Sequence, residues 1–348
     1  MKITLAEKSR INEVDFDNLA FGTSFTDHML VCHYENGKWQ EPEIRPYGEL
    51  NASYALHALH YGQSAFEGMK AYRNQQGEVA LFRPEQNWAR LNRSAERLLM
   101  PAVPEEVFLG GLKKLIDIDA AWVPQDEVKS LYIRPFLFAS SEFIAARPSE
   151  RYTFAVICSP VGPYYAGAVK VKIEDKFTRA TGGGIGFTKA AGNYGGAFYP
   201  TAKAIEEGYN QVIWTDHANH ERIEESGTMN IMFRIGDTMV TPPLTDRILA
   251  GITRESILTL LREWGHNVEE RPITVTEVVE AAKTGNLHEA FGMGTAAVVS
   301  PIQQIGYQGT RYEIPNPNDG MAAKIREGLN DIRLGRVEDK HGWMVSVK

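Results

Sequence analysis

The order of strand-like and helix-like segments places the strongest constraint on the fold of this 348-residue chain. Two apolar strand-like runs, "SLYIRPFLF" and "YTFAVICSP", follow one another, whereas the earlier stretch "PEQNWARLNRSAERLLM" has helical periodicity. Because strands and helices do not alternate regularly, a doubly wound parallel sheet is disfavoured and an α+β fold is predicted. The helix is expected to have one apolar face made of Trp88, Leu91, Ala95, Leu98 and Leu99.

The length of the chain and one local change in composition predict two domains. The segment "SPVGPYYAGA" has the glycine and proline density of a linker. We therefore expect an N-terminal domain at residues 1–157, a linker at 158–168 and a C-terminal domain at 169–348. Two hairpins are also predicted, with turns at Asn36-Gly37 and Gly236-Asp237.

The charge and the cysteine content narrow the classes of function. The formal net charge of −7 argues against a nucleic-acid or membrane-surface partner, because both need a basic face. Cys32 and Cys158 show neither the spacing of a metal site nor that of a disulfide framework. Neither an apolar signal segment at the N-terminus nor a long apolar run elsewhere is present, so a cytoplasmic, unprocessed protein is expected.

The stretch "GFTKAAGNYGGAF" surrounds Lys189 with glycine, alanine and asparagine. Most lysines are simply solvated, but neighbours this small would let a flat ligand lie against the backbone beside the amine. Lysine is also the side chain whose amine condenses with carbonyl groups. Lys189 is therefore a candidate for holding a carbonyl cofactor.

Pyridoxal phosphate is such a cofactor, and it needs an acid for its ring nitrogen and donors for its phosphate as well as a lysine. "ERIEESGTMN" offers Glu224 and Glu225, of which strand alternation should point only one inward. Thr253 is expected at the N-cap of the next helix, where free amides favour an anion, although capping alone also explains it. Thr295 is expected on a strand thinned by two glycines, so that a ligand could approach its backbone.

Two other patterns compete with this interpretation. "TGGGIG" at 181–186 looks like a dinucleotide loop, and Tyr199 with Lys203 looks like a dehydrogenase pair. A dinucleotide loop should follow a buried strand and open a helix, but the preceding "VKVKIEDKFTRA" is polar and no helical pattern starts at the glycines. An NAD(P)-dependent dehydrogenase therefore remains a distant alternative. Two histidine pairs lack a third ligand in a recognised spacing, so no metal site is predicted.

Six motifs occur in one order: "YGQSAFEGMKAYR", "YIRP", "KAAGNYGG", "EESGTMN", "TPPLTDRILAGITRESI" and "GMGTAAVVSP". Each is weak alone, but together they closely resemble the branched-chain amino acid aminotransferases, which are fold type IV pyridoxal phosphate enzymes. The matching motifs run from about Tyr61 to Pro301. The resemblance implies a D-amino acid aminotransferase-like fold, with a small N-terminal α/β domain and a larger C-terminal domain of mixed β structure.

The resemblance also implies roles for residues at the cofactor. Lys189 should bind the aldehyde and then move a proton between the substrate Cα and the C4′ carbon of the cofactor. Tyr194 should bond the phenolic oxygen of the ring, and Glu225 rather than Glu224 should meet the ring nitrogen. The implied phosphate ligands are Arg90, Ile252, Thr253 and Thr295, and Thr228 is also expected to bind the cofactor.

Arg90 illustrates what the resemblance adds to the pattern. Periodicity alone places it on the polar face of a helix, whereas the matching stretch "LFRPEQNWARL" implies a phosphate ligand that turns inward. For the substrate, the family match implies a pocket arginine for the distal carboxylate of glutamate, and core packing is the competing explanation of the pocket aromatics. The implied substrate-binding residues are Tyr61, Phe66, Tyr132 and Arg134, with the Thr295 and Ala296 amides for the α-carboxylate.

The implied function is a branched-chain amino acid transaminase that moves the amino group of L-leucine, L-isoleucine or L-valine to 2-oxoglutarate, and the reverse, by a ping-pong mechanism. A D-amino acid aminotransferase and an aminodeoxychorismate lyase-like enzyme are alternatives on the same scaffold. A homodimer or higher homo-oligomer is expected. Some relatives carry a redox cysteine pair where this chain has Ala297 and Ser300, so a thiol switch at those positions is excluded.

Overall fold

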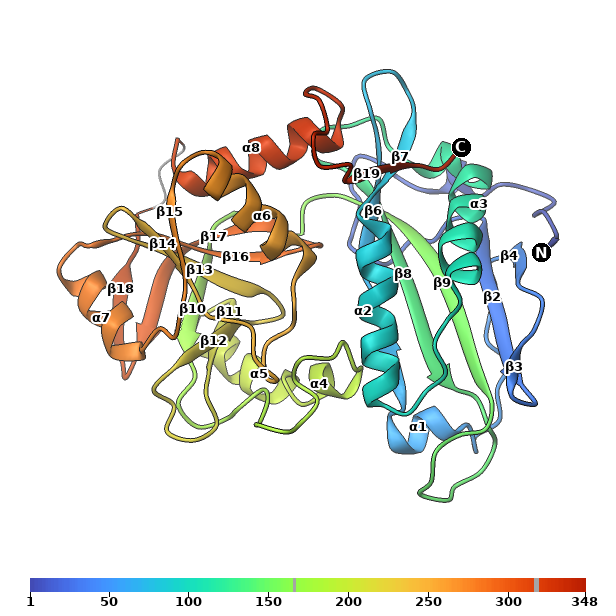
Figure 1. Ribbon diagram of the computed structural model, residues 1–348, viewed down its shortest axis with the longest axis horizontal. Helices are drawn as coiled ribbons and strands as arrows, with labels where there is room; N and C mark the ends of the chain where they lie inside the picture. The colour runs from blue at the N-terminus through green and yellow to red at the C-terminus, as the bar shows by residue number, and fades with distance from the viewer. Residues whose placement is uncertain (165–166, 316–318) are drawn as a thin grey trace. The chain divides into compact units, whose positions relative to one another are not determined.

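The computed structural model describes residues 1–164, 167–315 and 319–348, which form two compact units (Figure 1). The first unit comprises Met1–Tyr164, Thr188–Gly192 and Asn330–Lys348, and the second comprises Tyr165–Phe187 and Asn193–Leu329. The division after Tyr164 falls within the predicted linker, of which residues 158–161 continue a strand and residues 165–166 lie outside the described part. The last residues of the chain, Asn330–Lys348, also join the first unit.

The first unit is built on a sheet of ten strands among the described residues. Its main path runs β1-β4-β2-β9-β8-β6-β7-β19, with β3 added to β2 and β5 added to β8. All pairs are antiparallel except β1 with β4. The strands are β1 (Lys2–Ile3), β2 (His28–Glu35), β3 (Lys38–Trp39), β4 (Glu43–Pro46), β5 (Ser64–Phe66), β6 (Met69–Arg73), β7 (Val79–Phe82), β8 (Ser130–Ala139), β9 (Tyr152–Val161) and β19 (Met344–Ser346).

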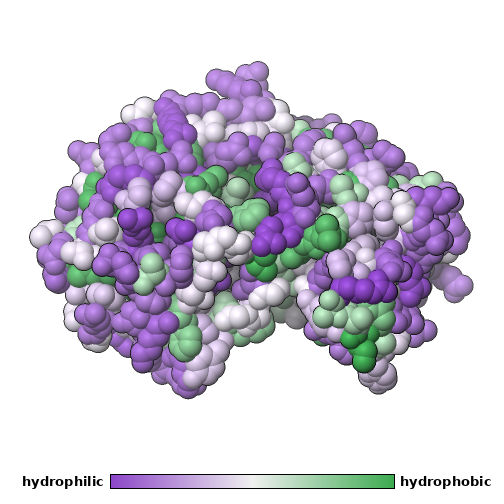
Figure 2. Space-filling view, turned by 60° about the horizontal axis from the view of Figure 1, so that its bottom comes forward, coloured by the Kyte–Doolittle hydropathy of each residue, from purple (hydrophilic) through white to green (hydrophobic). Residues whose placement is uncertain are grey.

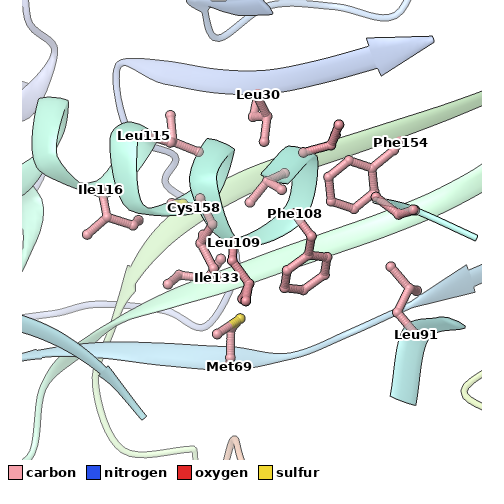
Figure 3. Packing of buried hydrophobic residues seen from close by; sticks show 14 of the residues in the cluster. Leu30, Met69, Leu91, Phe108, Leu109, Leu115, Ile116, Ile133, Phe154 and Cys158 are labelled. Carbon is pink, nitrogen blue, oxygen red and sulfur yellow. The ribbon is translucent and has the colours of Figure 1, made fainter. Parts of the chain in front are cut away.

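Helices cover one face of this sheet and bury its core. Figure 3 shows Phe108 and Leu109 packed toward residues of the central strands, such as Ile133 and Phe154. These four side chains are at most 8 % exposed, so burying them supplies much of the hydrophobic stabilisation of this unit. The helices are η1 (Ile11–Glu13), α1 (His57–Tyr61), α2 (Pro84–Arg97), η2 (Glu106–Gly110), α3 (Gly111–Ile118) and η3 (Ala120–Trp122).

Local sequence explains two details of the first unit. Asn36 and Gly37 both adopt positive φ, 54° and 76°, which confirms the predicted two-residue hairpin turn between β2 and β3. The prediction for the apolar face of α2 is wrong at Leu99, because the helix ends at Arg97. Leu99 then turns to φ 52° and is 69 % exposed.

The second unit contains a sheet of nine strands among the described residues, in the order β12-β11-β10-β17-β16-β13-β14-β15 with β18 added to β17. The sheet is mixed, because β10 pairs in parallel with β11 and β17, and β14 with β15. The turn at Gly236-Asp237 joins β13 to β14 as predicted. The strands are β10 (Val169–Ile173), β11 (Gln211–Thr215), β12 (Ile223–Ser226), β13 (Asn230–Ile235), β14 (Thr238–Thr241), β15 (Asn267–Glu270), β16 (Leu287–Gly294), β17 (Val298–Tyr307) and β18 (Thr310–Glu313).

The remaining helices are α4 (Gly192–Gly195), α5 (Phe198–Glu206), α6 (Ile252–Glu263), α7 (Val275–Lys283) and α8 (Met321–Arg333). The face shown in Figure 2 is mostly hydrophilic, with hydrophobic residues in small separate groups. None of the helices in the described ranges combines the length and the apolar character needed to span a membrane.

Candidate active site

Lys189 is held against the first unit by its backbone. The segment around it forms an isolated bridge with β5, in which the amide of Phe66 donates to the Lys189 carbonyl at 3.1 Å. The amide of Lys189 in turn donates to Ser94 Oγ on α2 at 3.0 Å. The lysine is thus fixed between a strand and a helix rather than carried on a free loop.

A row of buried polar residues on α2 faces this segment. Asn87, Arg90 and Ser94 are spaced three and four residues apart, which places them on one side of a helix. They are at most 4 % exposed. Arg90 therefore turns inward, as the resemblance implies. The polar pattern of the helix alone would place it at the surface.

Arg90 is paired with Glu67, a carboxylate that is fully buried. Its Nε donates to Oε1 and its Nη2 to Oε2, both at 2.8 Å, and Asn87 donates to Oε2 at 2.7 Å. Burial alone would raise the pKa of Glu67, but Arg90 and, more weakly, Lys189 hold the pKa below its ordinary value. One edge of the Arg90 guanidinium is thus taken by a carboxylate.

Three residues of the expected substrate pocket lie together, and one of them, Phe66, lies beside Lys189. The Lys189 Nζ lies 4.9 Å from the ring centre of Phe66, and the guanidinium carbon of Arg134 lies 4.6 Å from the same centre. Arg134 Nη2 donates to the Tyr132 hydroxyl at 3.0 Å, while its buried Nε has no hydrogen-bond partner among the described residues. An amine, a cation and aromatic surface are therefore brought together in one unit.

Tyr132 and Arg134 point away from the core because strand alternation turns Ile133 into it. Gly68 gives the Tyr132 hydroxyl its room, since a Cβ at this glycine would lie 2.2 Å from that oxygen. Tyr61 is placed elsewhere: its hydroxyl donates to the Ile144 carbonyl and its side chain is 42 % exposed.

The second unit contributes a held carboxylate. Glu225 on β12 is 4 % exposed, and its Oε1 accepts from Asn230 Nδ2 and from the Leu249 amide, each at 3.0 Å. Arg179 Nε lies 2.9 Å from its Oε2 as an ion pair. Two donors and a cation thus fix the position of this carboxylate.

Glu224 is buried as well, at 3 % exposure, so the prediction that only one of the two glutamates turns inward is wrong. The reason is that β12 is covered on both faces, and each face supplies an arginine. Arg247 Nε donates to Glu224 Oε1 at 2.5 Å, whereas Glu224 Oε2 has no hydrogen-bond partner in the described part of the chain.

The start of α6 lies next to the partners of Glu225. The N-cap is Gly251, so the expectation that Thr253 caps this helix is wrong, and Ile252 and Thr253 are its first two residues. The first intrahelical bond runs from Glu255 to the Gly251 carbonyl, so the preceding amides lie outside that ladder. Asn230 packs here too, because a Cβ at Gly251 would lie 2.0 Å from its Oδ1.

Thr295 also differs from its prediction. It lies in the turn between β16 and β17 rather than on a strand, and Ala296 follows in the same turn. The glycines before it do not open space for a ligand, since a Cβ at Gly292 would lie 2.5 Å from the side chain of Met229. Thr228 is exposed in the turn between β12 and β13.

Tyr194 lies on the short helix α4 and is half-buried. The competing "TGGGIG" pattern opens no helix, and its last glycine packs closely, with a Cβ at Gly186 falling 2.4 Å from Ala180. Tyr199 is 60 % exposed, and Lys203 pairs with Glu206 on the same helix. The described contacts give the dehydrogenase interpretation no support.

Sequence reasoning missed the residues that hold the predicted ones in place. These are buried polar side chains whose pairing depends on contacts between distant segments. Only the 87, 90, 94 spacing on one helix face was a signal that could have found part of the set. The missed residues are Glu67, Asn87, Ser94, Arg179, Asn230 and Arg247.

Comparison with known proteins places this arrangement in a family. The model of the amino-transferase class IV family matches residues 64–305. A "Probable branched-chain-amino-acid aminotransferase" of Staphylococcus epidermidis is 43% identical over 99% of this chain and 98% of its own length. "Branched-chain-amino-acid transaminase 1" of Bacillus subtilis is also 43% identical, over 96% of this chain and 95% of its own.

Solved structures agree with the fold. The branched-chain aminotransferase from Thermoproteus uzoniensis, with norvaline, matches at a TM-score of 0.77 and 25% identity, covering 92% of this chain and 100% of that one. The Escherichia coli branched-chain amino acid aminotransferase matches at 0.74 and 25%, covering 92% and 99%. The chain thus has the α+β fold of the fold type IV enzymes, as predicted. It belongs to the class IV aminotransferases and, within them, to the branched-chain-amino-acid aminotransferase family.

Proposed function

We propose that this chain is a branched-chain amino acid transaminase that moves the amino group of L-leucine, L-isoleucine or L-valine to 2-oxoglutarate, and the reverse. One observation supports this most directly. The Lys189 amine and the Arg134 guanidinium lie 4.9 and 4.6 Å from the centre of the Phe66 ring, so apolar surface, a nucleophilic amine and a carboxylate-binding cation share one place. A leucine side chain gains from the aromatic surface, and a glutamate side chain gains from the cation.

The donor set fits pyridoxal phosphate as the cofactor. Lys189 offers an amine for the aldehyde, and Glu225 offers a buried carboxylate for the ring nitrogen. Arg90 in the first unit and the first amides of α6 in the second unit each offer donors that suit a phosphate. When bound, this group supplies an electrophilic carbon for the amino group and a ring that withdraws electrons from the substrate Cα.

The side chains then divide the work. Lys189 Nζ moves the proton at the substrate Cα, and its backbone bonds to Phe66 and Ser94 keep the amine in reach. Glu225 holds the proton on the ring nitrogen, with Tyr194 proposed at the phenolic oxygen and Thr228 as a further contact. The proposed phosphate ligands are Arg90, Ile252, Thr253 and Thr295.

The substrate side must accept two chemically different side chains in turn, because a ping-pong cycle uses one site for both. Tyr132 and Phe66 provide the apolar surface, and Arg134 provides the charge for the distal carboxylate of glutamate or 2-oxoglutarate. The amides of Thr295 and Ala296 are proposed for the α-carboxylate. Tyr61 stays a proposed pocket residue, although its described contacts are with Ile144 and with the ring of His57.

The experiment that tests the proposal is covalent trapping followed by kinetics. Borohydride reduction of the holoenzyme and peptide mapping should label Lys189, and Lys189→Ala should lose both the label and transamination. Lys203, exposed and paired with Glu206, is the matched control. Label at Lys203, or turnover of D-alanine in preference to leucine, isoleucine and valine, would contradict the assignment.

We propose further that the chain is a cytoplasmic homodimer. Both cysteines are free and buried, which suits a reducing compartment, and burial raises the pKa of Cys32 to about 11. Large apolar side chains on and around α1 are exposed, which suits an interface with a second copy. They are Leu50, Tyr54, Leu59 and Ile144. Light scattering at several concentrations tests the mass, and a monomer throughout would refute the dimer.

A further inference from the structure

The buried carboxylate of Glu67 is unexpected beside a phosphate ligand. A negative charge 2.8 Å from the Arg90 guanidinium weakens the attraction of that arginine for an anion. Burying a carboxylate is also costly unless it is fully paired. A residue that opposes binding by its charge and is costly to bury needs a compensating role.

The geometry of the pair indicates that role. Glu67 accepts from Nε and from Nη2, which is the two-point contact that fixes the plane of a guanidinium. Asn87 and the Gly68 amide then fix the carboxylate itself, at 2.7 and 3.3 Å. Glu67 therefore fixes the direction in which the other edge of the Arg90 guanidinium, which carries Nη1, points.

The same helix face also sets the lysine. The Ser94 hydroxyl donates to the Arg90 carbonyl at 3.1 Å and accepts from the Lys189 amide at 3.0 Å. The same two turns of α2 therefore carry Arg90 and hold the backbone of Lys189.

We propose that Glu67 is a positioning residue that orients Arg90 toward the cofactor phosphate. The proposal rests on the proposed function, in which Arg90 is a phosphate ligand. Two effects of removing the Glu67 charge have opposite signs. Loss of orientation weakens phosphate binding, whereas loss of a repelling charge strengthens it. We expect orientation to prevail, because two charge-assisted hydrogen bonds at 2.8 Å act directly on the guanidinium.

The experiment compares two probes, pyridoxal phosphate and pyridoxal, which differ only in the phosphate. Their dissociation constants are measured by absorbance titration on the apo-protein. Glu67→Gln should weaken the binding of pyridoxal phosphate on the order of tenfold, which corresponds to the loss of a charged hydrogen bond. The binding of pyridoxal should not change. Glu67→Asp, which keeps the charge at a shorter reach, should recover part of the loss.

The control is Glu289→Gln, because Glu289 is also buried and paired but accepts from the first amides of α8 and binds Arg234 instead. It should lower thermal stability without changing either constant. If Glu67→Gln does not fold, Asn87→Ala removes one bond to the same carboxylate and should shift the pyridoxal phosphate constant in the same direction by less.

Arg90→Met separates this inference from the function on which it rests. It should abolish the preference for pyridoxal phosphate over pyridoxal, and Glu67→Gln should add nothing in its background. If Arg90→Met keeps the preference, the phosphate role of Arg90 fails. If Arg90→Met loses the preference but Glu67→Gln leaves it intact, weakens both probes equally or tightens pyridoxal phosphate, the positioning role fails.

Discussion

At the scale of single residues, the site combines charges that are costly to bury with partners that offset the cost. Arg134 lies against Phe66 and Tyr132, and its buried Nε lacks a hydrogen-bond partner among the described residues. An unsatisfied buried donor costs about 1–3 kcal/mol, and a carboxylate ligand would recover it. The arginine is thus poised for an anionic side chain.

Replacing Arg134 with glutamine should separate the two half-reactions. The glutamate half-reaction should fall by more than about tenfold, the loss of a charged hydrogen bond, while the leucine half-reaction changes little. Single-turnover absorbance measurements with each amino acid test this. Arg311→Gln is the control, because Arg311 lies on β18 in the second unit and also packs on an aromatic ring, that of Tyr209. A matched fall in both half-reactions would return Arg134 to a structural role.

The two adjacent glutamates allow a second test at this scale. Glu225→Gln should lose far more activity than Glu224→Gln, because only a charged partner keeps the ring nitrogen protonated. The substitutions are closely matched, since each glutamate is buried and paired with one arginine. Glu224 is the alternative partner for the ring nitrogen, because its buried Oε2 has no hydrogen-bond partner among the described residues. Steady-state rates decide, and a larger loss in Glu224→Gln would reverse the assignment.

Lys70 predicts a pH effect on stability. It is 5 % exposed on β6, and burial, with the nearby charge of Arg333, lowers its pKa from 10.5 to about 7. Below pH 7 both folded and unfolded chains carry the proton and the burial cost is at its largest. Between pH 7 and 10.5 the unfolded chain binds the proton and the folded chain does not. The free energy of unfolding therefore gains up to about 1.4 kcal/mol per pH unit.

Lys70→Met keeps the volume and removes the charge, so it should be more stable than the parent at pH 7 and lose this advantage toward pH 10. Urea unfolding across that range measures the difference, with the exposed Lys203→Met as the control. Parallel stability profiles of parent and Lys70→Met would show that Lys70 keeps its proton when folded.

At the scale of elements, the sequence predicted what depends on local periodicity and turn chemistry. The hairpin turns, the helix that became α2 and the strands β8 and β9 were all predicted, because their signals lie within a few residues. The N-cap of α6 was predicted two residues too late, because Gly251 occupies the cap and its lack of a Cβ leaves room for Asn230, a contact with no local sequence signal. Pairings between distant segments, such as Glu67 with Arg90, leave no local signal.

The glutamate pair shows the same limit from the other side. Alternation predicts that one of two neighbours faces solvent only if the other face of the strand is open. Arg179 and Arg247 come from loops that cover β12 on both sides, and nothing near Glu224 in the sequence announces them. The family motifs predicted the candidate site residues, whereas the structure was needed to find the residues that hold them in place.

At the scale of the whole molecule, the units do not follow the order of the chain. The first unit takes in the short Lys189 segment and the C-terminal residues from Asn330 onward. The C-terminal contribution is structural: β19 pairs with β7, Trp343 lies with its ring centre 5.7 Å from that of Phe82, and Val347 belongs to the core. The first unit therefore cannot be completed until the end of the chain is available.

Deleting residues 343–348 should therefore destabilise the first unit selectively. Trp343 is 7 % exposed, and loss of a buried tryptophan alone costs about 3–5 kcal/mol. The Arg83 amide, which donates to the Trp343 carbonyl at 2.7 Å at the start of α2, would lose its acceptor too. Hydrogen exchange followed by mass spectrometry should show faster exchange in β6, β7 and the first turn of α2. The strands β13 and β16 should keep their protection from exchange. Val337→Ala is the control, because Val337 is exposed in the same C-terminal segment, and this variant should keep its protection throughout the chain. Exchange that rises equally in β13 and β16 would mean that the two units unfold as one.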